Sequence, residues 1–193
     1  RVDWRWMLTD GGTKPAELTL CMGWKPETGF LKSRWSSYDE LMLLYLLGMG
    51  APEHTLPASS WSAWGRPIEK NEGYDVIRPG PIFMHQMTQI YVDLREQRDR
   101  LGYDYWQSSV NAHRANAAFC ARHANQFASY RGGIWGLNAS DVPEGYGTRE
   151  PREGHHDGTI CPTGAVAGLP FVPELSRTAI TAMYERYGDH IWG

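Results

Sequence analysis

The chain has 193 residues, of which 41% are hydrophobic and 21% are charged, and its formal net charge is −3. This composition is typical of a globular protein that is long enough to form one hydrophobic core. The small net charge and the lack of a basic run argue against a nucleic-acid or membrane-surface role, and no apolar run is long enough to cross a bilayer. The three widely spaced cysteines fit buried small side chains better than a disulfide framework or a zinc site.

The two ends of the sequence indicate a piece of a larger protein. The chain begins at Arg1 without a methionine or a signal peptide, and it stops at Gly193 within a pattern that does not look finished. We therefore expect that further segments, including a targeting segment, can lie outside this sequence.

The stretch that most constrains the fold is a helix predicted from about residue 37 to residue 48. It is apolar on all sides after Glu40, so it must be surrounded by other protein. Ser37 and Glu40 have the spacing of a capping box, which predicts the start of the helix. Two glycines and a proline follow and predict its end.

Helical spacing and turn signals predict the remaining elements. Further helices are expected at residues 82–94, 105–128, 162–169 and 173–187, while residues 59–64 can form a helical turn and residues 18–22 are a candidate strand. Residues 129–160 form a long glycine-rich loop, and such loops are usually functional or disordered. The aromatic side chains in this loop argue against disorder. With no strand-rich region and no alternation of strands and helices, the sequence predicts one all-α domain over residues 1–193.

Aromatic side chains are unusually numerous, with nine tryptophans, ten tyrosines and five phenylalanines. Many of them lie in stretches rich in glycine and proline. For any single one, filling the core is the commoner role. Taken together, aromatic residues on loops suggest a cleft with flat apolar walls, which suits the apolar face of a sugar ring.

Several familiar kinds of chemistry lack their motifs. There is no G-x-S-x-G, no phosphate-binding P-loop and no G-x-G-x-x-G that opens a helix, so no cofactor is predicted. The run His155-His156-Asp157 raises the question of a metal site. Adjacent histidines rarely bind one ion, and no H-E-x-x-H or cysteine partner accompanies them, so a solvated polar loop is preferred and no metal is predicted. His113 lies on the apolar stripe of its helix and is predicted to be a hydrogen-bonded core histidine.

The remaining candidates are carboxylates that lie among aromatic residues. Enzymes that cleave glycosidic bonds use a pair of carboxyl groups, one as a proton donor and one as a base or nucleophile. The candidates are Asp39, Glu40, Asp141 and Asp157. Two interpretations of Glu40 stay open. As the third residue of a capping box it would be held in its ionised form by the helix N-terminus, whereas burial beneath tryptophans would favour the protonated form that a general acid requires.

The residues around this helix also resemble a known family. Residues 36–52 resemble the signature of the bacterial "putative glucoamylase" (glycoamylase) domain family, which is related to endo-β-1,2-glucanases and to a domain of cyclic β-1,2-glucan synthases. The resemblance continues in the same order through residues 80–86, 104–106, 134–141, 157–163 and 169–174. It covers most of the chain from about Asp10.

The resemblance implies an (α/α)6 toroid with a large central cavity, of which 193 residues can supply roughly half. It implies that Glu40 is the catalytic acid facing that cavity, and that segments 135–141 and 156–159 line a sugar site. The substrate-binding residues predicted on this basis are Tyr38, Asp39, His85, Gln86, Trp135, Asn138, Asp141, His156 and Asp157.

The chain departs from the family pattern in two ways. Met87-Thr88-Gln89 follows His85-Gln86, and Leu94 stands where the family has phenylalanine, which bears on the choice of substrate. The family also continues with a Gly-Phe-x-Asp segment that is absent from this sequence, and an opposing carboxylate can lie there.

We therefore expect hydrolysis or transglycosylation of a glucan, with β-1,2-linked glucan suggested by the resemblance. The alternative is a carbohydrate-binding or scaffold module without catalysis. A lyase acting on acidic polysaccharide is a weaker option, because arginine and lysine do not cluster near the candidate site. We expect the full-length protein to be a periplasmic or secreted monomer that binds an oligo- or polysaccharide and needs no cofactor.

Overall fold

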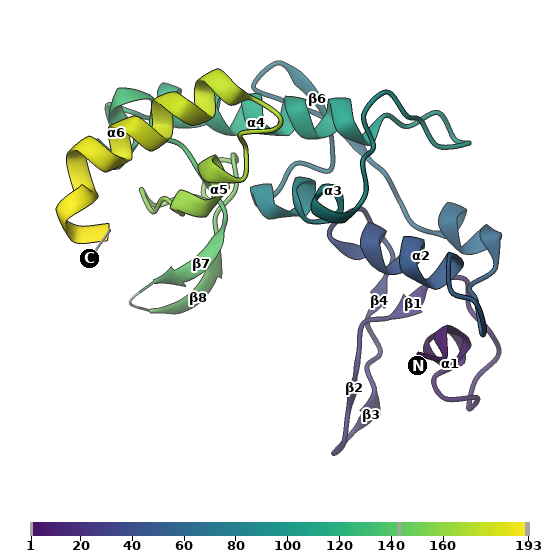
Figure 1. Cartoon of the computed structure of the whole chain (residues 1–193). Coiled ribbons are helices and arrows are strands. Elements are labelled where there is room, and N and C mark those ends of the chain that lie inside the picture. The colour runs from purple at the N-terminus through teal and green to yellow at the C-terminus, as the bar shows by residue number, and fades with distance from the viewer. Residues whose placement is uncertain (1, 143, 192–193) are drawn as a thin grey trace. The chain divides into compact units, whose positions relative to one another are not determined.

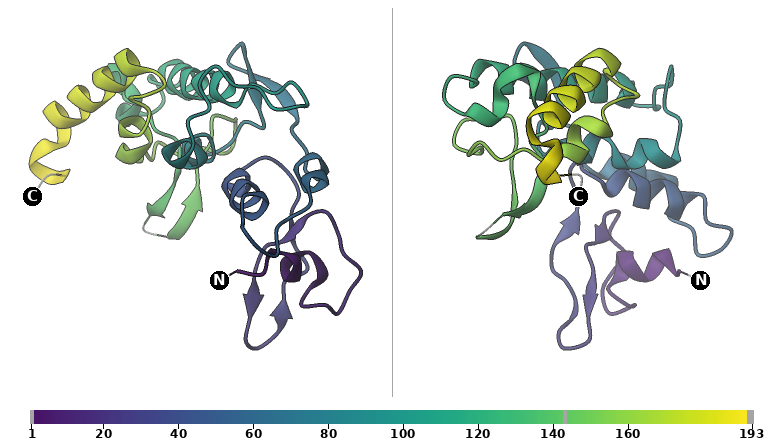
Figure 2. Two further views of the ribbon diagram at one scale, coloured as in Figure 1. Left: turned by 45° about the vertical axis from the view of Figure 1, so that its right-hand side comes forward. Right: turned by 60° about the vertical axis from the view of Figure 1, so that its left-hand side comes forward.

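The computed structural model describes residues 2–142 and 144–191. The chain divides into two compact units, Arg1–Pro67 and Ile68–Gly193, which Figures 1 and 2 show in colours running from purple to yellow. Each unit is described by itself below. The single domain predicted over residues 1–193 stays a prediction.

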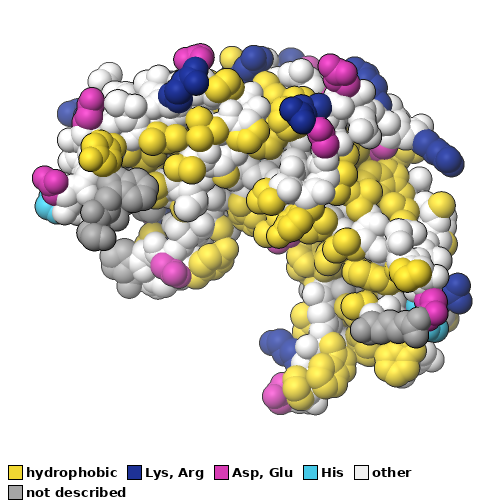
Figure 3. Space-filling model, viewed as in Figure 1, with side chains coloured by type: hydrophobic (Ala, Val, Ile, Leu, Met, Phe, Trp, Pro, Cys, Tyr) yellow, Lys and Arg dark blue, Asp and Glu magenta, His cyan; other side chains and the backbone are white. Residues whose placement is uncertain are grey.

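The first unit combines two α-helices with an irregular hairpin. Its elements are α1 (Trp4–Thr9), β1 (Leu20–Cys21), β2 (Trp24–Lys25), β3 (Gly29–Phe30), β4 (Arg34–Trp35), α2 (Leu41–Met49) and the 3-10 helix η1 (Ala58–Ala63). β1 pairs with β4 and β2 pairs with β3, both antiparallel. Figure 3 shows hydrophobic and charged side chains together on the surface of this hairpin, and Trp24 within it is 56% exposed.

The predicted central helix is confirmed as α2, and Tyr45 joins it to the hairpin. The Tyr45 side chain is fully buried. Its hydroxyl donates to the carbonyl oxygen of Trp35 at 2.8 Å and accepts from the N–H of Leu20 at 2.9 Å. Because burial raises the pKa of Tyr45, this hydroxyl stays protonated and keeps both bonds. One side chain therefore connects α2 to β1 and to β4.

Helix α1 was not predicted from the sequence, and Arg34 secures its end. Asp3 caps its start by accepting from the N–H of Arg5, and Asp10 ends it with a left-handed φ of 48°. The Arg34 guanidinium donates to the carbonyl of Leu8 at 3.1 Å and to Asp10 at 2.9 Å. Carbonyl groups at a helix C-terminus need such donors, so a distant arginine completes a helix that is too short to be recognised by periodicity.

The second unit contains the longer helices. Its elements are β5 (Ile68–Asn71), β6 (Tyr74–Ile77), η2 (Ile82–His85), α3 (Met87–Tyr91), α4 (Tyr105–Arg122), η3 (Ala128–Gly133), β7 (Ala139–Val142), β8 (Gly145–Thr148), α5 (Pro162–Val166) and α6 (Pro173–Ile191). α6 packs against α5 and η3, η3 packs against α4, and β6 lies along α4 (Figures 1 and 2).

The all-α prediction needs correction, because the described residues form four two-stranded antiparallel sheets. These strands have two to four residues, which is too short for an alternating pattern to be visible in the sequence. The turn between β5 and β6 resembles the type I′ turns of hairpins, because its two central residues, Glu72 and Gly73, have positive φ values of 47° and 86°. The helix predicted over 82–94 is two shorter helices, and the one predicted over 105–128 ends at Arg122.

A buried extended segment, residues 134–138, crosses the core of the second unit. Among the described residues its backbone pairs with no strand, so other groups must satisfy its polar atoms. The Asn116 side chain accepts from the N–H of Leu137 and donates to its carbonyl, both at 3.0 Å. The Cys161 N–H donates to the carbonyl of Gly136 at 3.0 Å. The segment is thereby fixed between α4 and the chain that enters α5.

The Gln86 side chain makes a second buried connection in this unit. Its amide nitrogen lies 2.8 Å from the carbonyl oxygen of Gly164 and 2.9 Å from Nε2 of His113. Nδ1 of His113 lies 2.6 Å from the carbonyl oxygen of Ser109, so this ring donates through Nδ1 and accepts through Nε2. Burial lowers the pKa of His113 to about 4, which keeps the ring neutral. The prediction of a hydrogen-bonded core histidine is confirmed.

Two further expectations concern cysteines and membranes. All three cysteines are free thiols; Cys21 and Cys120 are buried, as predicted, whereas Cys161 is only partly buried. Among the residues that the structure describes, no helix is both long and apolar enough to cross a membrane.

The Tyr45 connection predicts the effect of Tyr45→Phe. Loss of the hydroxyl leaves the Leu20 N–H and the Trp35 carbonyl unsatisfied, so the full-length protein should lose about 1–3 kcal/mol of stability in urea unfolding. Tyr146 is 72% exposed, so Tyr146→Phe should change stability by less than about 0.5 kcal/mol. Equal effects of the two substitutions would contradict this role of Tyr45.

The crossing segment predicts that Gly136 cannot be replaced. Its φ is 142°, and a Cβ atom there would lie 2.6 Å from the carbonyl oxygen of Cys161. Gly136→Ala should therefore cost about 2–5 kcal/mol, from strained φ and overpacking together. Gly145 has a φ of 116° with open space around it, so Gly145→Ala should cost only about 1–2 kcal/mol. Thermal unfolding of both variants checks this difference, and similar melting temperatures would refute it.

Candidate functional site

The Glu40 carboxylate stands at the start of α2, but it does not cap the helix. Glu40 occupies the N-cap position and makes no side-chain cap hydrogen bond. Asp39 takes that role, because its Oδ1 accepts from the N–H of Leu41 at 2.7 Å. The predicted capping box is therefore wrong. The backbone of Ser37 still pairs with Gly65, so the chain is extended there and the helix begins later than the sequence pattern suggested.

An aromatic cluster lies beside this helix start. The ring of Trp64 lies 6.4 Å from that of Tyr38 and 5.1 Å from that of Trp61. The buried Arg66 guanidinium lies 3.2 Å from the Trp64 ring centre and donates to the carbonyl of Trp61 at 2.6 Å. Tyr38 and Trp64 are almost completely buried, so they support the start of α2 from within the core. Glu40 itself is only partly buried.

The loop between η3 and α5 brings Asp157 together with an arginine that the sequence analysis did not single out. The Arg149 guanidinium donates to both carboxylate oxygens of Asp157, at 2.6 Å and 3.2 Å for the shortest contact with each. Asp157 also accepts from the N–H of Thr159 at 3.0 Å. The hydrogen bond from Arg149 is the main reason that the pKa of Asp157 lies well below its usual range. Asp157 is therefore an ionised acceptor, and not a proton donor, at neutral pH.

This ion pair borders a polar surface pocket of about 310 Å³. The pocket is lined by the predicted residues His156 and Asp157, together with Gly147, Thr148, Arg149, Gly154 and His155. Asp141 lies nearby in the sequence, on the exposed β7–β8 hairpin, where it pairs with Tyr146. Glu40 belongs to the first unit and this pocket to the second.

Four predicted binding residues lie inside the second unit. Trp135 is 1% exposed, and its indole N–H donates to the carbonyl of Leu175 at 3.2 Å. Asn138 accepts from the N–H of Phe83, and Gln86 makes the connection described above. His85 is also buried, and this burial lowers its pKa to about 3. Because these side chains are buried, the structure does not support direct contacts between them and a sugar. Their hydrogen bonds connect loop segments to one another within the core.

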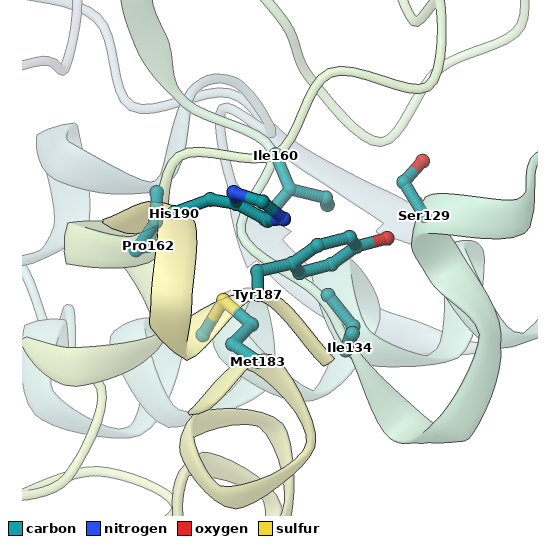
Figure 4. A pocket seen from close by; sticks show the side chains of 7 residues that line it. All are labelled: Ser129, Ile134, Ile160, Pro162, Met183, Tyr187 and His190. Atoms are coloured by element: carbon teal, nitrogen blue, oxygen red, sulfur yellow. The ribbon is translucent and has the colours of Figure 1, made fainter. Parts of the chain in front are cut away.

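A second, apolar pocket of about 240 Å³ lies beside α6. Figure 4 shows its lining residues, Ser129, Ile134, Ile160, Pro162, Met183, Tyr187 and His190. None of these lining residues is a carboxylate, and none belongs to the predicted site. This pocket offers no acid–base pair for glycosidic chemistry.

The side-chain contacts that sequence reasoning missed involve arginines and one histidine. Arg66 pairs with the nearby Trp61 and Trp64, whereas Arg149 and His123 pair with residues of the 149–160 loop. Arginine and histidine at isolated positions carry no periodic signal, so no sequence pattern would have singled them out.

The fold is shared with solved structures of glucoamylase-like and glucanase-like proteins. An endo-β-1,2-glucanase from Chitinophaga pinensis, solved with sophorotriose and glucose, is 25% identical with a TM-score of 0.88; the match covers 100% of this chain and 48% of that one. A "putative glucoamylase" from Bacteroides caccae is 28% identical with a TM-score of 0.85, again over 100% and 48% of the two chains.

The chain belongs to the family described as "Putative glucoamylase" (Glycoamylase), whose model matches residues 32–193. This confirms the family resemblance seen in the sequence. A relative from Parabacteroides distasonis, named as an exo-β-1,2-glucooligosaccharide sophorohydrolase acting at the non-reducing end, is 24% identical over 88% of this chain. The chain spans 27% of that relative's length and about half the length of the matched structures.

The pKa of Asp157 provides a test of the Arg149 contact. In Arg149→Gln, the pKa of Asp157 should rise toward its ordinary value of about 3.9, as followed by carboxyl carbon NMR. A depressed pKa stabilises the folded state above the unfolded-state value, and this contribution is lost as the pH falls through the folded-state pKa. The stability difference from wild type should therefore be present at pH 7 and shrink below about pH 4. Arg152→Gln is the control, and an equal rise there would refute the assignment.

Proposed function

We propose that the full-length protein is a glycoside hydrolase or transglycosylase that acts on a β-1,2-linked glucan, with Glu40 as the general acid. The observation that carries this proposal is the family match over residues 32–193. It is supported by relatives whose names state an action on β-1,2-linked glucose chains. The proposal concerns the whole protein, because this chain spans less than half of each of these relatives.

The proton donor in this proposal is the Glu40 side chain. Asp39 provides the helix cap, and within the described residues the Glu40 carboxylate has no recorded hydrogen bond or ion pair. It is thus available to protonate the oxygen that leaves when a glycosidic bond breaks. The rigid, buried start of α2 would hold the carboxyl group in one position, as a general acid requires.

A glycosidase also needs a second carboxylate, about 6.5–9.5 Å from the acid in inverting enzymes and about 5–5.5 Å in retaining ones. We assign this role to the part of the full-length protein that lies outside this chain. Asp157 is neutralised by Arg149 and suits the binding of sugar hydroxyl groups, as does the exposed Asp141. We further propose that the helices belong to an (α/α)6 toroid around this site, and that the protein acts in the periplasm or outside the cell.

The proposal predicts a selective loss of activity in Glu40→Gln. Because Glu40 does not cap α2, stability should stay within about 0.5 kcal/mol of wild type. The rate of β-1,2-glucan cleavage should fall by about 100-fold or more, since the amide cannot donate the proton in the same way. Glu27→Gln, in the exposed turn between β2 and β3, is the matched control and should keep full activity.

The same assay separates the enzyme from a binding module. Wild-type protein should release reducing ends from β-1,2-linked chains faster than from β-1,3- or α-1,4-linked chains. Tight binding of β-1,2-glucan without any cleavage would instead favour the carbohydrate-binding alternative. Equal turnover by wild type and Glu40→Gln would remove Glu40 from the catalytic role.

A further inference from the structure

Three potential metal ligands converge where the end of α4 meets the 149–160 loop. His123 follows the last residue of α4, and Glu153 and His156 come from the loop. Their ligand atoms all lie within 4.8 Å of one another. Nε2 of His123 lies 3.1 Å from one Glu153 oxygen, and Nε2 of His156 lies 3.8 Å from the other. Tetrahedral zinc, with bonds of about 2.0–2.2 Å, spaces its ligand atoms about 3.3–3.5 Å apart.

Each of the two rings has a polar contact at Nδ1, and its Nε2 atom faces Glu153. Nδ1 of His123 lies 2.9 Å from the carbonyl oxygen of Phe119, so it carries the proton and Nε2 is an acceptor. Nδ1 of His156 lies 3.4 Å from the hydroxyl oxygen of Tyr130, which contacts the ring on the side away from Glu153. Such contacts behind the ring orient most metal-binding histidines.

These contacts put acceptor against acceptor. In the neutral tautomer, Nε2 of His123 and the nearby oxygen of Glu153 both present lone pairs at a separation of 3.1 Å. Two acceptors that close repel each other unless a proton on Nε2 or a cation beside them supplies positive charge. Arg122 supplies part of that charge, with Nη1 at 2.9 Å from Glu153 and 3.5 Å from His123. Arg122 also holds Glu72 at 2.6 Å, so it can release Glu153 without losing its other carboxylate partner.

The site is closed on the protein side and open on the solvent side. The His156 and His123 side chains are 4% and 9% exposed, whereas that of Glu153 is 67% exposed. The rings of Phe119 and Phe127 pack edge-on against His156 at 4.8 Å and 5.3 Å. Two imidazoles packed among aromatic rings and one exposed carboxylate leave the solvent side open to a further ligand such as water.

We propose that His123, Glu153 and His156 form a divalent metal site that takes Zn²⁺. Imidazole nitrogens suit zinc and other late transition metals, whereas Ca²⁺ and Mg²⁺ prefer sites made of oxygen atoms. The ion would join the end of α4 to the 149–160 loop and so hold the polar pocket that contains Asp157. This assignment is independent of the proposed glycosidase function, and it gives His156 a role other than sugar binding.

The test is calorimetric titration of ZnCl₂ into the full-length protein after metal removal with EDTA. One Zn²⁺ per chain should bind, and Co²⁺ in its place should give the visible absorption of a tetrahedral site. His156→Gln and the exposed substitution Glu153→Gln should each weaken Zn²⁺ binding by about 100-fold or more, since even outer contacts to a metal ligand are worth 10–100-fold.

The adjacent pair His155 and Glu150 provides the matched control. These side chains lie 3.3 Å apart, and His155 is 54% exposed, so they form a surface histidine–carboxylate pair outside the proposed site. His155→Gln and Glu150→Gln should leave Zn²⁺ affinity within about twofold of wild type. Absence of stoichiometric Zn²⁺ binding to wild type would overturn the proposal, as would an equal loss in the control variants. The proposed activity on glucan can fail or hold without changing either result.

Discussion

The fixed position of the buried segment 134–138 determines much of the second unit. An extended strand without a strand partner must find hydrogen bonds elsewhere, and here Asn116 supplies both a donor and an acceptor to Leu137. The absence of a side chain at Gly136 lets the backbone of Cys161 approach closely. Residues 139–160 begin directly after this segment, and Cys161, which follows them, is hydrogen-bonded to Gly136. Core contacts therefore fix both ends of this loop, whose regular structure, among the described residues, is limited to the β7–β8 hairpin.

Several side chains that were predicted to bind substrate instead make hydrogen bonds inside the core. Gln86 joins Gly164 to His113, Asn138 receives the N–H of Phe83, and Trp135 lies in the core. Asp141 and Asp157 are left at the surface, and the largely buried Arg149 holds Asp157. The motif that resembles the family thus combines residues that hold the loop with residues that can meet a ligand. In the first unit, likewise, Asp39 has a structural role because it caps α2, whereas the Glu40 side chain makes no cap hydrogen bond.

The sequence was a good guide to long or strongly signalled elements and a poor one to short elements. The apolar run after Glu40, the stripe of α4 and the proline that opens α6 predicted three helices, because burial and capping leave clear patterns there. The short strands and α1 were not predicted from the sequence, because contacts with distant residues such as Arg34 stabilise them. Sequence spacing also could not distinguish Asp39 from Glu40 as the cap, or show that Trp135 is buried, because both depend on the backbone path outside the motif.

The account rests on the position of the Glu40 side chain relative to a bound glucan. A crystal structure of full-length Glu40→Gln with an intact β-1,2-linked gluco-oligosaccharide measures this directly. The account predicts that the side-chain amide at position 40 lies about 2.6–3.2 Å from one glycosidic oxygen, or one water molecule away. An oligosaccharide bound with every glycosidic oxygen beyond that reach would contradict it.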